Sequence, residues 1–218
     1  MLTLRYKDDT LVECGLDEAG RGCLWGPFYA AAVIWDGGEL SKEIKDSKKI
    51  SAKKRERIYE GIMACGKVGI GVVTAKEIDE WGMTKANRTA FERALAALPV
   101  KPARILIDGC LAINTDTEQI VEPEMDNKYL CVAAASIIAK VSRDKWVQAY
   151  VEAHPILQER YTLNNCKGYG TLKHRNGILE YGKDELHRNL FLRKLLGSNQ
   201  SKDTKNSNDT TCEFLEEI

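Results

Sequence analysis

Two adjacent carboxylates, Asp17 and Glu18, follow an apolar run and lead into the turn Gly20-Arg21-Gly22. Glycine has no Cβ, so the backbone of such a turn can approach a bound ligand closely, and arginine can bond a phosphate or a sugar through its planar guanidinium group. The segment therefore indicates metal and phosphate chemistry in one place. The alternative is an ordinary glycine turn that is capped by acids.

Two further acids, Asp108 and Asp126, are expected at the end of a strand and in a loop. A fold can gather such distant residues around one point. Crowded carboxylates raise one another's pKa values unless a cation neutralises them. Oxygen ligands without a nearby His or Cys cluster favour Mg²⁺ or Mn²⁺ over zinc. Each of these two acids also suits a plain turn, because Gly109 and Asn127 follow them.

Basic residues gather between positions 45 and 57, where seven basic residues stand against two acidic ones. Ser47, Lys48 and Lys49 precede an expected helix, where side chains and amides can grip phosphates. The alternative for this run is a solvated charged face. Further along, Tyr169 lies between two glycines, so its ring can lie against a sugar or a base, or else pack within its loop.

The composition predicts one soluble globular domain, since 44% of the 218 residues are hydrophobic and 29% are charged. No apolar run approaches the ~20 residues that cross a bilayer, and the first residues lack the apolar core of a signal peptide. We therefore expect a cytoplasmic protein. The seven cysteines are scattered, with no Cys-x-x-Cys pair, and indicate reduced thiols instead of a zinc site or disulfides.

The formal net charge is zero, but the charges are unevenly placed along the chain. Residues 197–218 contain two lysines and five acidic residues, so residues 1–196 carry a net charge of +3. Such an excess attracts a polyanion only where it is focused on one surface.

The hydrophobic pattern alternates between short β-like runs and helical segments. Strands are predicted over residues 11–16, 28–35, 68–74 and 104–108. Helices are predicted over residues 52–65, 84–98 and 130–154, with a short helix opened by a capping box at 74–77 and another from Thr171 to about Gly182. Residues 164–170 are predicted as a polar loop and residues 197–218 as a disordered polar tail. This order is typical of an α/β layer fold.

Taken together and in order, these motifs resemble type 2 ribonuclease H, the bacterial ribonuclease HII group. The resemblance runs from about Val12 to Leu195, and the ordered set is far more specific than any single motif. The matching blocks are Asp17-Glu18-Ala19-Gly20-Arg21-Gly22 with Gly26-Pro27, Asp46-Ser47-Lys48-Lys49, Ile107-Asp108-Gly109, residues 133–141 with Arg143-Asp144, residues 167–171, and His187-Arg188.

The resemblance implies an α/β fold, a ribonuclease H-like mixed β-sheet flanked by helices. The catalytic domain would cover residues 1–196, including a small C-terminal helical part from about residue 155 that helps to hold a duplex, before the tail 197–218. The resemblance also implies metal-binding catalytic acids and Mn²⁺ or Mg²⁺ as cofactor. These acids would be Asp17, Glu18, Asp108 and Asp126.

The substrate-binding residues follow from the same resemblance. Gly20, Arg21 and Gly22 match the element that senses the ribose 2′-hydroxyl, and Tyr169 matches the ring that stacks on that sugar. Ser47, Lys48 and Lys49 match phosphate contacts. Three positions depart from the family's pattern: Cys23 replaces a common proline, Cys110 a common asparagine, and Met125 a common glycine. The last departure bears most on Asp126, because losing a glycine can change the backbone of that loop.

The implied activity is endonucleolytic hydrolysis of the RNA strand of RNA/DNA hybrids, and incision 5′ of ribonucleotides embedded in duplex DNA, leaving a 3′-hydroxyl and a 5′-phosphate. Two divalent ions would activate a water and stabilise the leaving oxygen. Such an enzyme would work as a monomer in ribonucleotide excision repair and DNA replication, with these duplexes and no membrane as partners.

Three other functions remain open on the residues alone. A junction resolvase or integrase-type nuclease would also use clustered acids and Mg²⁺, but has no need of a ribose-sensing turn. A non-catalytic nucleic-acid-binding protein would use the basic segments for affinity and the acids as turn residues. A phosphate-transferring enzyme fits less well, because the chain has no Gly-x-x-x-x-Gly-Lys-Ser/Thr loop.

Overall fold

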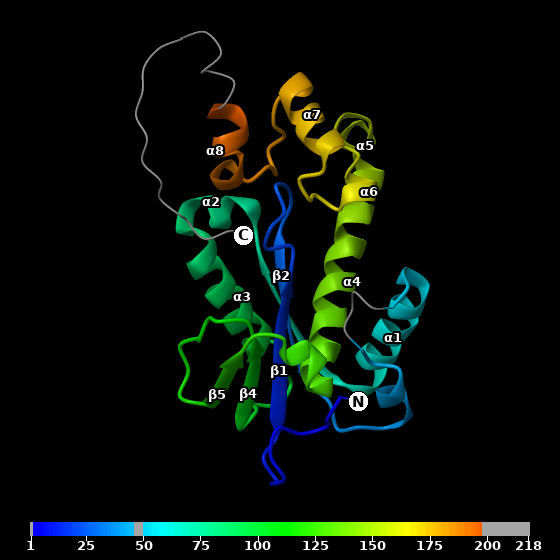
Figure 1. Cartoon of the computed structure of the whole chain (residues 1–218), viewed down its shortest axis with the longest axis vertical. Helices are drawn as coiled ribbons and strands as arrows, with labels where there is room; N and C mark the ends of the chain where they lie inside the picture. The colour runs from blue at the N-terminus through cyan, green and yellow to red at the C-terminus, as the bar shows by residue number, and fades with distance from the viewer. Residues whose placement is uncertain (1, 46–49, 198–218) are drawn as a thin grey trace.

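A five-stranded mixed β-sheet forms the centre of the molecule in the computed structural model, which describes residues 2–45 and 50–197 (Figure 1). The strand order is β3-β2-β1-β4-β5, in which β1 pairs antiparallel with β2 and parallel with β4. The strands are β1 (Glu13–Ala19), β2 (Phe28–Ile34), β3 (Lys67–Val73), β4 (Arg104–Asp108) and β5 (Glu118–Glu122).

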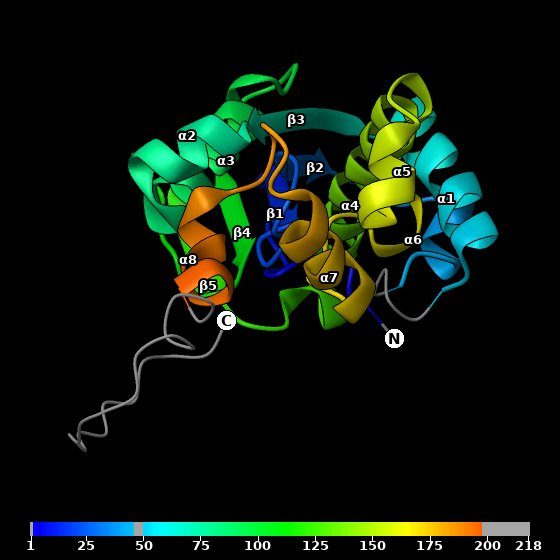
Figure 2. The same ribbon diagram turned by 90° about the horizontal axis from the view of Figure 1, so that it is seen from above.

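Helices cover both faces of this sheet. Seen from above, α2 and α3 lie on one side of the sheet, and α1 and α4 lie on the other (Figure 2). The α-helices are α1 (Ala52–Cys65), α2 (Ala75–Trp81), α3 (Met83–Ala96), α4 (Leu130–Ala153), α5 (Ile156–Tyr161), α6 (Leu163–Cys166), α7 (Leu172–Tyr181) and α8 (Asn189–Gly197), with short 3₁₀ turns η1 (Glu39–Lys42) and η3 (Met125–Asn127). The predicted α/β layer fold is confirmed.

Each face of the sheet has its own apolar core. Along β1, Cys14 and Leu16 pack with the α3 side, whereas Gly15 and Ala19 lie on the α4 side. This follows from the strand period of two, which sends successive side chains to opposite faces. Residues Val132 to Ala135 of α4 are fully buried. Most of their side chains are small, which allows this helix to lie close to the sheet.

Most predicted elements are confirmed, with shifts of one to three residues at their ends. Ser51 caps α1 by accepting the N–H of Lys54, and Thr74 and Glu77 form the predicted capping box of α2. The first strand runs from Glu13 to Ala19, so Asp17 and Glu18 belong to the strand itself and not to the turn. The prediction of a continuous loop over 164–170 was wrong in its first part, because α6 ends at Cys166.

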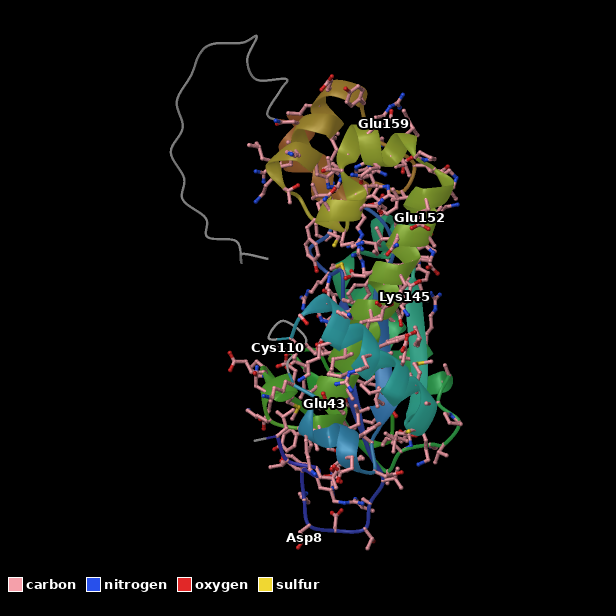
Figure 3. The ribbon with its side chains drawn as sticks, turned by 90° about the vertical axis from the view of Figure 1, so that its right-hand side faces the viewer. Asp8, Glu43, Cys110, Lys145, Glu152 and Glu159 are labelled. Carbon is pink, nitrogen blue, oxygen red and sulfur yellow. The ribbon has the colours of Figure 1, made fainter. Side chains whose placement is uncertain are left out.

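A small helical part, α5 to α7, continues from the far end of α4. Figure 3 shows Asp8 at one end of the molecule and Glu159 of α5 near the other, with Lys145 of α4 between them. This part has its own core, in which Trp25 and Val147 pack with Leu157 and Ile178. Because Trp25 follows β1 closely in sequence, the helical part is tied to the segment just after the central strand. In the part of the chain that the structure describes, no helix combines the length and apolar character needed to span a membrane.

The backbone of α4 meets that of β1 at Gly15. A Cβ atom built on Gly15 would lie 2.3 Å from the carbonyl carbon of Cys131 and from the nitrogen of Val132. No side chain fits there, since both neighbours are backbone atoms. Gly15 therefore fixes the distance between the central strand and the helix that packs on it.

We expect Gly15→Ala to lower the free energy of unfolding by about 2 to 3 kcal/mol, because overpacking a close backbone contact forces the helix away from the strand. Urea denaturation would measure this change. Gly197→Ala is the matched control, since a Cβ there meets no atom within 4 Å and should change stability by less than about 0.5 kcal/mol. Equal effects of the two substitutions would contradict this account.

Candidate active site

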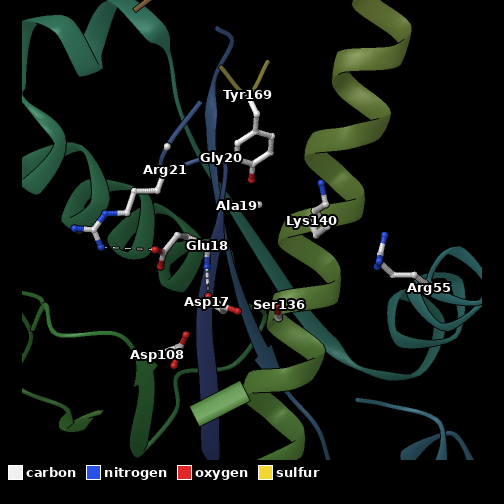
Figure 4. Close-up of a pocket in the computed structure, with 11 residues that line it drawn as sticks. Asp17, Glu18, Ala19, Gly20, Arg21, Arg55, Asp108, Ser136, Lys140 and Tyr169 are labelled. Atoms are coloured by element: carbon white, nitrogen blue, oxygen red, sulfur yellow. Dashed lines mark hydrogen bonds and ion pairs between the residues drawn. The ribbon is translucent and has the colours of Figure 1, made fainter. Parts of the chain in front are cut away.

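A cleft of about 300 Å³ opens where β1 and β4 end, beside α4 (Figure 4). It brings together acids, the glycine turn, Tyr169 and two basic side chains. Its lining residues are Asp17, Glu18, Ala19, Gly20, Arg21, Gly22, Arg55, Asp108, Ser136, Lys140 and Tyr169. Most of the residues that the sequence singled out for chemistry thus share one cavity.

Strand pairing brings the carboxylates together. Leu16 of β1 is paired with Ile107 of β4 in parallel, so Asp17 and Asp108 are the next residues on two neighbouring strands. The strand period places these two acids on the α4 face, whereas Glu18 points to the other face at the same strand end. Figure 4 shows the three carboxylates around this end of the sheet.

The three carboxylates have polar partners within the protein. Asp17 accepts the N–H of Glu18 at 2.7 Å and is hydrogen-bonded by Ser136. Asp108 accepts the N–H of Met125 at 2.8 Å, and Glu18 lies 4.0 Å from the guanidinium of Arg21. Burial, together with the charges of Glu18 and Asp108, holds the pKa of Asp17 well above its ordinary value.

These acids are suited to a hard cation, although they do not form a ready-made cage. Among residues 2–45 and 50–197, no three His, Cys, Asp or Glu side chains are grouped closely enough to hold an ion. Oxygen donors are the ligands that Mg²⁺ and Mn²⁺ prefer, and a cation between Asp17 and Asp108 would relieve the repulsion that raises the pKa of Asp17. By its chemistry, this oxygen-only donor set therefore suits a divalent metal ion.

Asp126 lies near this site but does not line the cleft. It belongs to the turn η3, is 5% exposed and accepts the amide of Asn127 at 2.9 Å. The neighbouring Met125 donates its N–H to Asp108, which connects the two segments. Met125 has an ordinary backbone and is fully buried, whereas Glu124 adopts the left-handed conformation (φ 61°). The missing glycine therefore causes no strain at position 125.

The turn Gly20–Gly22 packs against the buried side chain of Arg143. Gly20 has φ 88°, and a Cβ there would lie 2.1 Å from Nε of Arg143, so only glycine fits. Arg143 comes from α4 and donates to the carbonyl oxygens of Trp25, Pro27 and Lys167. The sequence did not reveal this role, because an arginine in a helix is usually a surface residue.

Tyr169 projects into the cleft from the loop that follows α6, as Figure 4 shows. Tyr169 is 41% exposed, and the centroid of its ring lies 5.8 Å from Nζ of Lys140. The backbone of Tyr169 pairs with that of Cys23, so the tyrosine and the glycine turn are neighbours. A ring in this position can contact a sugar that enters the cleft.

Sequence reasoning missed three residues of the cleft: Arg55, Ser136 and Lys140. Ser136 and Lys140 are four residues apart on α4 and therefore lie on one helix face, which the sequence could have shown. Lys140 forms an ion pair with Asp144 on the same helix at 2.9 Å. Arg55 belongs to the basic run 45–57, but Ser47, Lys48 and Lys49 lie outside the described residues.

Comparison with known proteins identifies the class. The solved ribonuclease H2 of Pyrococcus horikoshii OT3 superposes with a TM-score of 0.69 at 27% identity, covering 87% of this chain and 99% of that one. The ribonuclease HII in the structure of its complex with PCNA from Archaeoglobus fulgidus superposes with a TM-score of 0.68 at 26% identity, covering 82% of this chain and 94% of that one. The protein has the ribonuclease H-like fold.

Sequence comparison identifies the family within this fold. The family model for Ribonuclease HII matches residues 14–194. Ribonuclease HII from Pseudothermotoga lettingae is 41% identical over 85% of this chain and 80% of its own length. Ribonuclease HII from Caldicellulosiruptor saccharolyticus is 40% identical over 84% of this chain and 88% of its own length. The chain belongs to the ribonuclease HII family. It is thus an endonuclease of the ribonuclease H type, acting on RNA/DNA hybrids.

Behind the cleft, two histidines form a buried pair. The Nε2 atoms of His174 and His187 are 3.0 Å apart, and both rings are almost completely buried. Burial lowers the pKa of both imidazoles, that of His187 to about 4. Both histidines thus have hydrogen-bond partners inside the protein, and neither lies at the surface.

The histidine pair predicts acid sensitivity of the fold. An unfolded histidine binds a proton near pH 6.5 and the folded His187 only near pH 4, so its stabilising contribution is complete above pH 6.5 and is lost as the pH falls toward 4. We expect the difference in unfolding free energy between wild type and His187→Gln to shrink by about 3 kcal/mol over this range. Urea denaturation at several pH values would measure it, with His154→Gln as an exposed control. A difference that does not change with pH would contradict this origin.

Proposed function

We propose that this protein hydrolyses the phosphodiester bond on the 5′ side of a ribonucleotide, both in RNA/DNA hybrids and at ribonucleotides embedded in duplex DNA. The products would carry a 3′-hydroxyl and a 5′-phosphate. One observation carries the proposal: the acids, the turn Gly20–Gly22 and Tyr169 open into the same cleft. Acids alone would serve many nucleases, but a close-approach turn and a tyrosine ring beside them suit the recognition of a ribose.

Asp17, Glu18 and Asp108 would hold divalent cations, Mg²⁺ or Mn²⁺, with Asp126 joining from the adjacent turn η3. Bound divalent cations supply an activated water and stabilise the leaving 3′-oxygen. Support comes from the oxygen-only donor set and from the raised pKa of Asp17, which a cation would relieve.

The other residues of the cleft would bind and orient the nucleic acid. The exposed backbone of Arg21 and Gly22 would meet the ribose 2′-hydroxyl, and the ring of Tyr169 would lie against the sugar. Arg55 and Lys140 carry positive charge on the α1 and α4 side, where they would contact phosphates flanking the scissile bond. Ser47, Lys48 and Lys49 would extend these phosphate contacts along the chain.

We further propose that residues 1–196 act as one catalytic domain, with the helical part from about residue 155 helping to hold the duplex. The shared core of Trp25 with α4, α5 and α7 supports this single unit. The enzyme would work as a monomer in ribonucleotide excision repair and DNA replication.

Replacing Asp108 by asparagine should lower kcat by at least about a hundredfold on a duplex that contains one ribonucleotide. The substitution keeps the shape but removes the charge that would hold a cation. Binding of the duplex should be retained, because fewer carboxylates then face its phosphates. Gel analysis of end-labelled strands and fluorescence anisotropy would measure the two effects. Asp116→Asn is the matched control on an exposed acid of the next loop, and a near-normal rate for Asp108→Asn would contradict the assignment.

Arg55→Ala should weaken binding of an all-DNA duplex and of a ribonucleotide-containing duplex by similar factors. A phosphate contact carries no sequence or sugar information, so its loss should also reduce the slope of log K against log salt concentration by about 1. Arg57→Ala, on the same helix but paired with Glu43 outside the cleft, is the control. An unchanged slope for Arg55→Ala would argue against a phosphate contact.

A further inference from the structure

The carbonyl groups of Gly20 and Arg21 in the turn Gly20–Gly22 face the interior of the protein. Arg188, which is fully buried, donates from Nη1 to the carbonyl oxygens of Gly20 at 2.7 Å and Arg21 at 3.1 Å. Its Nε donates to the carbonyl oxygen of Gly26 at 2.9 Å. One guanidinium group thus collects three carbonyl oxygens from the two ends of the segment that contains the turn.

This arrangement fixes the direction of two N–H groups. In a planar trans peptide the C=O of one residue and the N–H of the next point in opposite directions. Because the carbonyls of Gly20 and Arg21 point inward to Arg188, the N–H groups of Arg21 and Gly22 point outward. Both residues are exposed and line the cleft, and neither N–H has a hydrogen-bond partner among the described residues. Arg188 therefore turns two adjacent donors toward the cleft.

His187, the residue before Arg188, acts on the neighbouring Tyr169 through the histidine pair. Asp184 donates its N–H to Nδ1 of His187 at 2.8 Å, so the proton of a neutral His187 is on Nε2. Nε2 of His187 then donates to Nε2 of His174, whose own proton is on Nδ1. That proton is donated to the carbonyl oxygen of Tyr169 at 2.9 Å. This chain of hydrogen bonds holds the backbone from which the Tyr169 ring projects.

We propose that His187 and Arg188 are positioning residues that set the two ribose-reading elements in a common geometry. Arg188 orients the amides of Arg21 and Gly22, and His187 acts through His174 on Tyr169. This inference rests on the proposed function, since it concerns how the same cleft recognises a ribonucleotide within a duplex. Adjacent positions in the chain connect both elements, so the amides and the ring are positioned together.

Arg143 supports the same region without this effect on the turn amides. Its three acceptors are the carbonyl oxygens of Trp25, Pro27 and Lys167, none of which precedes the N–H of Arg21 or Gly22. Arg188 is therefore the residue to test for amide orientation.

The test compares Arg188→Lys with Arg104→Lys in steady-state incision of a DNA duplex that contains one ribonucleotide. A lysine ammonium lacks the planar fork that reaches three carbonyls. Arg104 is the control, because it is a buried arginine with three partners, Asp9, Glu13 and Glu118, at the opposite end of β4. Thermal denaturation would establish that both variants are folded and how much stability each has lost.

We expect Arg188→Lys to lower kcat by about tenfold or more, with KM changed less than about threefold, because the phosphate contacts are untouched while two donors are misaligned. Arg104→Lys should lose stability but keep its kcat. His187→Gln should also lower kcat while leaving KM nearly unchanged. If Arg188→Lys does not fold, His187→Gln provides the test instead.

Wild-type kcat in folded Arg188→Lys and His187→Gln, or an equal loss in Arg104→Lys, would overturn the positioning role. A wild-type enzyme that fails to incise the single-ribonucleotide duplex in Mg²⁺ or Mn²⁺ would instead overturn the proposed function on which the inference rests. The two failures are therefore distinguishable from one experiment.

Discussion

Repulsion between carboxylates that share one cleft is the constraint on which this structure depends. Asp17 and Asp108 lie at the ends of neighbouring parallel strands, and Glu18 lies beside them, so burial and like charge raise the pKa of Asp17. An isolated strand end would not hold such a group. The sheet does so because β1 is paired on both sides and because α4 meets its backbone at Gly15. The fold thus keeps acids together that would separate in a looser scaffold.

Buried arginines order the loops around the acids. The segment from Gly20 to Pro27 has few strand hydrogen bonds, so its carbonyl oxygens need other donors. Arg143 and Arg188 supply these donors from α4 and from the segment before α8. A guanidinium group offers five N–H donors, and burial strengthens each contact. The C-terminal part of the chain therefore orders the entrance to the site as well as adding surface to it.

Much of the architecture was predictable from local sequence. The capping box at Thr74, the Ser51 cap and the apolar runs of β2, β3 and β4 determined their elements, because short-range hydrogen bonds and side-chain period act locally. The edge strand β5 was missed, and the C-terminal helical part was expected without the individual helices α5, α6 and α8. β5 is charged and only partly buried, so its pairing with β4 comes from tertiary contact and not from a hydrophobic pattern.

The sequence identified most residues of the site but not the hydrogen bonds that position them. Asp17, Glu18, Asp108, the glycine turn and Tyr169 were identified from motifs, and the structure places them around one cleft. The roles of Arg143, Arg188 and His174 were not predictable, because each depends on carbonyl oxygens from distant segments that no spacing rule connects. Asp126 stays a prediction as a ligand, since it lies beside the cleft and not on its wall.

The most direct test of the central claim is to map the ends produced from three end-labelled duplexes, all-DNA, DNA with one ribonucleotide, and a long RNA/DNA hybrid, with Mg²⁺, Mn²⁺ or a chelator. The account predicts metal-dependent incision immediately 5′ of the single ribonucleotide, leaving a 3′-hydroxyl, together with cleavage of the hybrid and no cleavage of all-DNA. Incision of the all-DNA duplex, or tight binding of all three without any cleavage, would contradict it.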